Sequence, residues 1–193
     1  GEVHSGEVHC AAFSPDGKQV VTASADGAAR LWDAASGECL HSLEGHQGKV
    51  LSAAFSPDSQ QVVTASDDGV AMLWDAASGE CLHTLEGHRD DIFCAAFSPD
   101  GQQVVTASGD TTAKLWDAAS GECLHTFQGH GDSVWSAAFS PDSRQVLTAS
   151  HDSTAKLWDA ASGECLHTFQ GHGGGVWFAV FSPDSRQVDY RLC

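Results

Sequence analysis

Residues 50–85 read VLSAAFSPDSQQVVTASDDGVAMLWDAASGECLHTL, and this stretch decides the fold. Short apolar runs alternate with the turn clusters SPDS, DDG and DAASG, a pattern typical of strands joined by tight turns. The pattern predicts four strands, which we call a, b, c and d, at roughly 50–55, 61–66, 70–75 and 80–85. A sheet of this size cannot bury both faces by itself, so neighbouring units are expected to stack on it.

The stretch is one copy of a unit that recurs every 42 residues. Trp74 lies 42 positions after Trp32, and Trp116 and Trp158 follow at the same interval. Between 92–133 and 134–175, 32 of 42 positions are identical, which is closer than packing requires and indicates recent duplication. A fixed period of this length predicts a repeat architecture.

Three short motifs identify the kind of repeat. GH stands at 45–46, 87–88, 129–130 and 171–172, LWD stands at 31–33, 73–75, 115–117 and 157–159, and FSPD occurs in five places. These motifs resemble the blades of WD-repeat β-propellers over roughly residues 3–188. The near-identical copies are also similar to amplified bacterial propellers and to the propeller regions of NACHT-type incompatibility and immune receptors.

The resemblance implies an all-β fold, a β-propeller of four-stranded antiparallel blades. We expect one array over residues 1–193, with blades at about 5–43, 47–85, 89–127 and 131–169 and a truncated fifth blade at 173–193. The tail FSPDSRQVDYRLC (181–193) begins in register but loses the repeat at Asp189, which predicts only the start of strand b and leaves His172 without its repeat partners. The chain is then a fragment of a longer propeller, a subunit of a ring that other copies complete, or an open arc.

Composition narrows the classes of partner. The chain carries 9 basic and 26 acidic side chains, a formal net charge of −17, which argues against nucleic acid and against anionic membranes as partners. Where charge contributes to binding, a basic protein or peptide is favoured. Cys39, Cys81, Cys123 and Cys165 occupy equal phases of the repeat, so we expect reduced thiols and a cytoplasmic protein, and we expect no cofactor.

Each complete unit carries a His, a Ser and an Asp, the residue types of a nucleophilic triad. A set repeated in every unit is more typical of structure than of one active site, and no G-x-S-x-G turn is present to expose a serine. In similar WD repeats the d–a loop His, the strand b Ser, the b–c turn Asp and the strand c Trp form a hydrogen-bonded relay. The residues that match this relay are His4, Ser24, Asp26, Trp32, His46, Ser66, Asp68, Trp74, His88, Ser108, Asp110, Trp116, His130, Ser150, Asp152 and Trp158.

The Cys-x-His pairs on strand d offer a second chemical alternative. Cys39 and His41 are two residues apart, as are the matching pairs of the other units, and strand alternation is expected to place both side chains on one face. Zinc takes about four ligands, and each blade offers two. We therefore expect neither a catalytic residue nor a metal site, and a hydrolase or a metal-binding protein stays the alternative.

Differences among the copies concentrate in the d–a loops, the b–c turns and two strand positions, whereas the a–b turn is always SPDG or SPDS and the c–d turn is always DAASGE. In a propeller the variable segments share one face, and exposed Trp and Phe are typical interface anchors, unless they pack near the central channel. The sequence thus predicts a non-catalytic protein-interaction scaffold, with a non-functional fragment as a further alternative. The expected partner-binding residues are Glu7, His9, Arg30, Lys49, Leu51, Asp67, Met72, Asp91, Phe93, Lys114, Ser133, Trp135, His151, Lys156 and Trp177.

Overall fold

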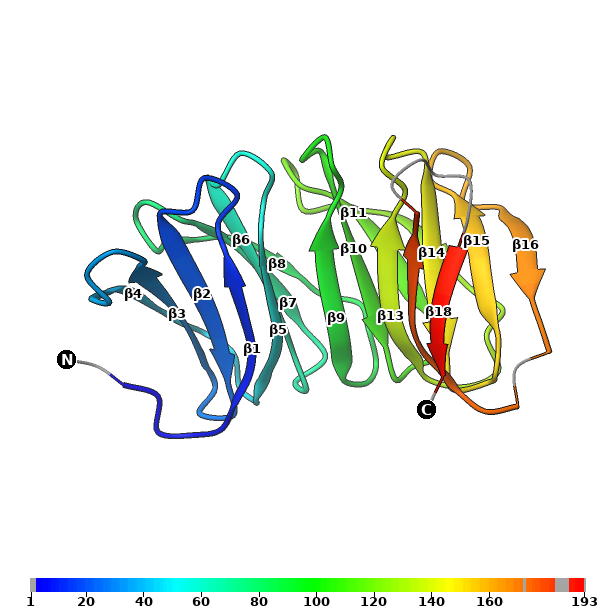
Figure 1. Cartoon of the computed structure of the whole chain (residues 1–193), viewed down its shortest axis with the longest axis horizontal. Coiled ribbons are helices and arrows are strands. Elements are labelled where there is room, and N and C mark those ends of the chain that lie inside the picture. Colours follow the sequence, from blue (N-terminus) through cyan, green and yellow to red (C-terminus); the bar gives the residue numbers. More distant parts are fainter. Residues whose placement is uncertain (1–2, 172, 183–187, 193) are drawn as a thin grey trace.

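The computed structural model describes residues 3–171, 173–182 and 188–192, and within these ranges the chain is built from strands (Figure 1). The strands form four antiparallel sheets of four strands and one sheet of two, which we number as blades 1 to 5. The described residues include no helix of the length and apolarity needed to cross a membrane.

The strand bounds repeat from blade to blade. Blade 1 contains β1 (Val8–Phe13), β2 (Gln19–Ser24), β3 (Ala28–Asp33) and β4 (Cys39–Glu44). Blade 2 contains β5 (Val50–Phe55), β6 (Gln61–Ser66), β7 (Ala71–Asp75) and β8 (Cys81–Leu85). Blade 3 contains β9 (Ile92–Phe97), β10 (Gln103–Ser108), β11 (Ala113–Asp117) and β12 (Cys123–Phe127). Blade 4 contains β13 (Val134–Phe139), β14 (Gln145–Ser150), β15 (Ala155–Asp159) and β16 (Cys165–Phe169), and blade 5 contains β17 (Val176–Phe181) and β18 (Val188–Leu192).

The fifth blade departs from the expectation. β18 pairs with β17 along its whole length, with Val180 opposite Asp189 and Ala179 opposite Tyr190. The prediction of only the start of a strand b is therefore wrong, because antiparallel pairing uses backbone N–H and C=O groups and does not need the side chains of the repeat. His172 and residues 183–187 lie outside the described residues.

The core lies between the blades. One face of blade 1, with Val21, Leu31 and Leu43, packs on the facing side of blade 2, where Phe55 and Trp74 lie. The same arrangement recurs between blades 2 and 3, between blades 3 and 4, and between blade 4 and β17. Alternation along each strand supplies one apolar set to each neighbour, so stacking buries both faces of the inner blades.

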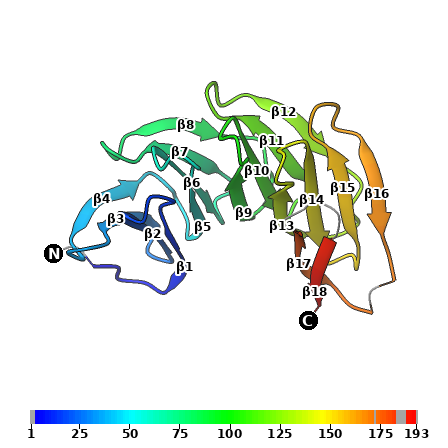
Figure 2. The same cartoon turned by 45° about the horizontal axis from the view of Figure 1, so that its top comes forward.

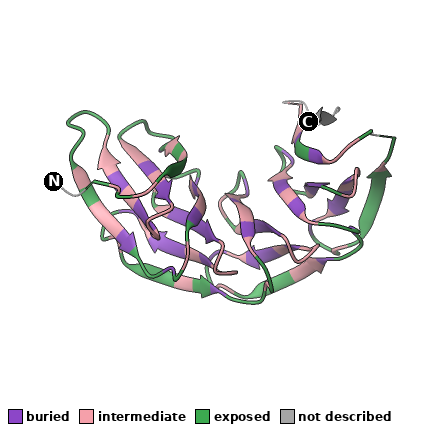
Figure 3. Cartoon of the chain, turned by 90° about the horizontal axis from the view of Figure 1, so that it is seen from below, coloured by how far each residue is buried: buried purple, intermediate pink, exposed green. Residues whose placement is uncertain are grey.

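The blades succeed one another along an open arc whose two ends lie apart (Figure 2). Strand a of each blade lies on the concave side and strand d on the convex side, and buried residues lie between the blades (Figure 3). The first blade consequently has one uncovered face: Phe13 is 71% exposed, whereas its repeat equivalent Phe55 is 9% exposed. The described chain thus has the shape of an open arc.

Candidate functional site

The d–a loop and the b–c turn of each blade are joined by a backbone hydrogen bond. Asp67 N donates to Lys49 O at 3.1 Å in blade 2, and His151 N donates to Ser133 O at 2.9 Å in blade 4. Equivalent bonds join Ala25 to Glu7 and Gly109 to Asp91. The segments that vary among the copies thus form one surface, which we call the variable face, and the a–b and c–d turns form the constant face at the other ends of the strands.

Beneath the variable face, each complete blade holds a chain of four polar side chains. In blade 3, Trp116 Nε1 donates to Thr106 Oγ1 at 2.9 Å, and Thr106 Oγ1 lies 2.8 Å from His88 Nε2. His88 Nδ1 lies 2.8 Å from Asp110 Oδ2. The same contacts recur in blades 1, 2 and 4.

The relay therefore runs Asp–His–Thr–Trp, and the prediction of a Ser link is wrong. Ser108 is the last residue of β10. Its Oγ accepts from Asp110 N and donates to Asp90 O, both at 3.1 Å. Ser108 therefore links the b–c turn to the d–a loop and is not bonded to the His88 imidazole. The Thr and the Ser of the triplet TAS occur in every complete unit, and because they are two residues apart they lie on the same face of the strand. Comparison of the copies therefore could not show which of the two contacts the His. The serines concerned are Ser24, Ser66, Ser108 and Ser150, and the true links are Thr22, Thr64, Thr106 and Thr148.

The protonation states follow from burial and bonding. Burial lowers the pKa of His46, His88 and His130 below the usual value, even though the neighbouring Asp carboxylates act in the opposite direction. For Asp152, burial alone would raise the pKa, but hydrogen bonds from Gly131 N, Thr154 and His130 outweigh it and lower the pKa to about 2.

A neutral His and an ionised Asp satisfy every atom of the relay. The imidazole Nδ1–H donates to the carboxylate, Nε2 accepts the Thr hydroxyl, and the Thr oxygen accepts the indole N–H. In the hydrolase alternative the His would face the Ser, but here His Nε2 faces a Thr that is fully buried in blades 2 and 3. The Ser–His–Asp set of that alternative is not formed in the four complete blades.

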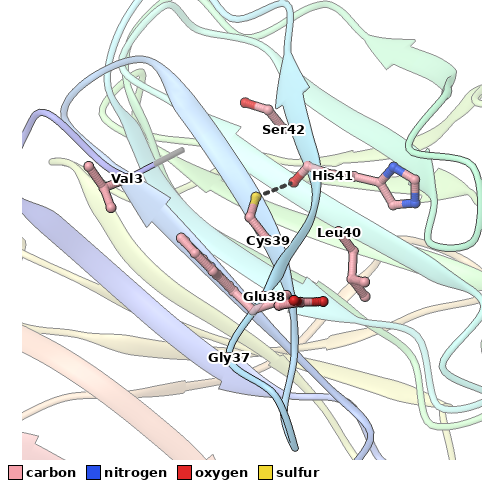
Figure 4. A pocket seen from close by; sticks show the side chains of 8 residues that line it. Val3, Gly37, Glu38, Cys39, Leu40, His41 and Ser42 are labelled. Carbon is pink, nitrogen blue, oxygen red and sulfur yellow. Dashed lines mark hydrogen bonds between the residues drawn. The ribbon is translucent and has the colours of Figure 1, made fainter. Parts of the chain in front are cut away.

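The Cys-x-His pairs do not share a face. A register irregularity between Leu31 and Trp32 places Cys39 opposite Trp32, and the Cys39 Sγ and the His41 ring lie on opposite sides of β4 (Figure 4). Sγ donates to the His41 carbonyl at 3.6 Å, whereas His41 Nε2 lies 2.9 Å from Ala77 O of blade 2. The prediction of one face is wrong because a bulge breaks the alternation of a strand. No group of three or more potential metal ligands occurs among the described residues.

A row of variable side chains follows the concave side of the arc. In every strand a the pairing register skips one residue, and the skipped residue is the one that varies most in size and chemistry. A bulged residue leaves the ladder and can point away from the interblade core. We call these residues the bulge row; they are His9, Leu51, Phe93, Trp135 and Trp177.

The aromatic members of the bulge row stack on one another. The rings of Phe93 and Trp135 are 4.3 Å apart at 24°, and those of Trp135 and Trp177 are 4.6 Å apart at 18°. Such pairs contribute about 0.5 to 1.5 kcal/mol each beyond their burial. The stack is partly buried and partly exposed: Trp177 is 44% exposed, whereas Nε1 of Trp135 is buried and has no hydrogen-bond partner among the described residues.

The remaining predicted partner-binding residues fall into two groups: two that contact their own blade or the core, and others on the loops and on strand c. Arg30 is taken up inside blade 1, where its guanidinium bonds Asp26 at 2.9 Å and also contacts His4. Met72 packs against the core between blades 1 and 2. Arg30 is therefore held by contacts within its own blade, and Met72 is partly buried. The loop residues on the variable face are Glu7, Lys49, Asp67, Asp91, Ser133 and His151, and the strand c lysines are Lys114 and Lys156.

On the constant face, the invariant Asp and Ser side chains form hydrogen bonds within their own turns. Asp58 Oδ1 accepts from Ser56 Oγ at 2.6 Å and from Gln60 N at 3.0 Å, and Asp75 Oδ1 accepts from Ala77 N and Ser78 N at 3.0 and 2.8 Å. Asp and Ser at these positions stabilise the turns directly. The contrast between constant and variable loops therefore has a structural cause in addition to any selection for binding.

Comparison with known proteins agrees with this geometry. The family model "WD domain, G-beta repeat" matches residues 2–33, 37–75, 79–117, 121–159 and 163–188. WD repeat-containing protein 38 of Mus musculus is 52% identical over 42 residues, which are 22% of this chain and 14% of that protein. WD repeat-containing protein 86 of Homo sapiens is 45% identical over 42 residues, 22% of this chain and 11% of that protein.

Both matches span a small part of these relatives. They show similarity of one repeat and say nothing about the activity of the whole relative. Proteins of the WD-repeat family generally act as protein-interaction scaffolds and are typically not enzymes. The matches to the family model cover most of the chain, in agreement with the blades and the four relays. The chain belongs to the WD-repeat β-propeller family.

Proposed function

We propose that this chain is a protein-interaction module that binds its partner through the variable face together with the bulge row. The observation that carries the proposal is the bulge row itself. Its residues change from His to Leu to Phe to Trp in blades whose pairing and core stay nearly constant.

The position of the bulge row explains how it can vary without harm to the fold. The flanking residues Val50, Ile92, Val134 and Val176 are fully buried between the blades, whereas the bulged residue leaves the ladder on the concave side. Large aromatic side chains that are half exposed and supported by neighbours are typical binding anchors, because little conformational entropy is lost when a partner covers them.

Charge supports a basic partner. The loops of the variable face carry Glu7, Asp67, Asp90, Asp91 and Asp132 against the basic residues Lys49 and Arg89, in a chain of net charge −17. Burial, together with Asp90 and Asp67, raises the pKa of Asp91, so a positive group placed there would relieve this repulsion. A peptide that combines an apolar side chain for the row with Lys or Arg beside it fits both features.

Substitution of the bulge row is expected to abolish partner recovery while the fold is kept. Trp135→Ala and Trp177→Ala remove the stacked anchors, and a loss of about tenfold or more in the recovered partner is expected in co-precipitation. Leu82→Ala is the matched control, since Leu82 is 41% exposed on β8 at the convex side. Equal recovery by all variants, with unchanged melting, would contradict the proposal.

We also propose that copies of the chain associate through the uncovered face of blade 1. Val8 is 48% exposed and Phe13 is 71% exposed, whereas their equivalents Val50 and Phe55 are 0% and 9% exposed beneath blade 1. Light scattering during size-exclusion chromatography is expected to give masses above 20.2 kDa that rise with concentration. A mass of one chain at every concentration would rule this association out.

A further inference from the structure

Blade 3 carries a polar pocket at the variable face that no residue of the bulge row lines. The pocket has a volume of about 220 Å³ and is lined by Arg89, Asp110, Thr112, Lys114, Thr126 and Gln128. Arg89 comes from the d–a loop, Lys114 from β11, and Thr126 from β12, so three separate segments of the chain meet there.

The two cations of this pocket have no anionic partner within the described residues. Lys114 Nζ donates to Thr126 Oγ1 at 2.9 Å, which holds the ammonium in place, and neither Lys114 nor Arg89 forms an ion pair. The carboxylate that lines the pocket already accepts four hydrogen bonds: Asp110 accepts from His88 Nδ1 and Arg89 N through Oδ2, and from the backbone N–H and hydroxyl of Thr112 through Oδ1. Hydrogen-bond donors of both cations thus remain available in a protein that has few cations.

The other complete blades differ at this place. Blade 4 keeps the hydroxyls, the amide and the lysine, with Lys156 Nζ bonded to Thr168 Oγ1 at 2.9 Å, but Gly131 stands where blade 3 has Arg89. In blade 2 the lysine position is Met72, and in blade 1 it is Arg30, which is paired with Asp26. A pair of uncommitted cations is therefore a property of blade 3.

We infer that this pocket binds a phosphoryl group carried by a Ser or Thr side chain of the protein partner. The inference rests on the proposed function, since it assigns a second contact on the same face. A phosphoryl group carries nearly two negative charges and three acceptor oxygens, which matches the two cations and the Gln128 amide, whereas the Thr112 hydroxyl is already donated to Asp110 Oδ1. Asp110 also lines the pocket and offsets one cation, but the pocket keeps a net positive charge, so a phosphoryl group of nearly two charges is attracted more strongly than a carboxylate of one. The negative charge elsewhere on the chain is screened beyond about 8 Å at physiological ionic strength.

The test uses phosphoserine as the probe in an NMR titration of the isotope-labelled chain. Saturable shifts are expected at the Arg89 side-chain Nε–H and at the Thr112 amide. Arg89→Gly, which reproduces the residue of blade 4, is expected to weaken phosphoserine binding about tenfold or more, as loss of one charge-assisted hydrogen bond predicts. Arg89→Gln is the second variant, and both keep the backbone N–H that bonds Asp110.

Blade 4 supplies a gain-of-site variant. A Cβ on Gly131 would meet only the Asp152 Cβ, at 3.8 Å, so Gly131→Arg is accommodated and is expected to create a second set of shifts around Thr154 and Lys156. Equal binding by wild type and Arg89→Gly, no gain in Gly131→Arg, or glutamate binding as tightly as phosphoserine would each overturn the inference. Trp135→Ala separates the two proposals, because it should abolish partner recovery and leave phosphoserine binding unchanged.

Discussion

Replacement of Phe55 by alanine is expected to lower the free energy of unfolding by about 3 to 5 kcal/mol. The Phe55 ring is 9% exposed and lies in the core between blades 1 and 2 with Val21 and Leu31. Its removal opens a cavity in the apolar core that the two sheets share. Chemical denaturation measures the loss, as a shift of the midpoint at unchanged slope.

The same substitution one repeat earlier is the control. Phe13 has the same place in strand a but is 71% exposed, so Phe13→Ala is expected to change the stability of the isolated chain by less than about 0.5 kcal/mol. If copies associate through blade 1, this variant should weaken the association. A large loss of stability in Phe13→Ala under conditions where the chain is monomeric would contradict the open face described for blade 1.

Substitution of Thr106 by valine is expected to destabilise the chain by about 2 kcal/mol or more. Valine keeps the shape of threonine but removes the hydroxyl, which leaves the Trp116 indole N–H and the His88 Nε2 without partners in a buried site. Each unsatisfied buried group costs about 1 to 3 kcal/mol. Thermal and chemical unfolding measure the effect.

Two matched variants show whether the relay is the cause. Thr84→Val makes the same change at an exposed site on β8 and should cost less than about 0.5 kcal/mol. Ser108→Ala should destabilise the loops but leave the Trp116 indole N–H resonance in place, whereas Thr106→Val should shift it. An indole resonance that responds to Ser108→Ala and not to Thr106→Val would restore the serine to the relay.

The repeat by itself determines the architecture of this protein. The strands predicted at 50–55 and 61–66 coincide with β5 and β6, because alternation of apolar residues and Pro, Asp and Gly in the turns are local signals. The period shows that the His, Asp and Trp recur in every unit, and the resemblance to WD repeats implies their relay and the division into a variable and a constant face. The family could be named from the sequence because its motifs recur in every blade.

The tertiary structure decides which side chain meets which. Thr106 rather than Ser108 links His88 to Trp116, and Cys39 points away from His41, because strand registers and bulges are set by backbone pairing that alternation cannot predict. The exposure of Phe13 depends on the neighbour that a sheet has and not on the residue, which is the same in every copy. Likewise, Arg30 and Lys114 share one phase of the repeat, but the Arg30 guanidinium bonds Asp26 in blade 1, whereas Lys114 Nζ bonds Thr126 Oγ1 in blade 3 and forms no ion pair among the described residues.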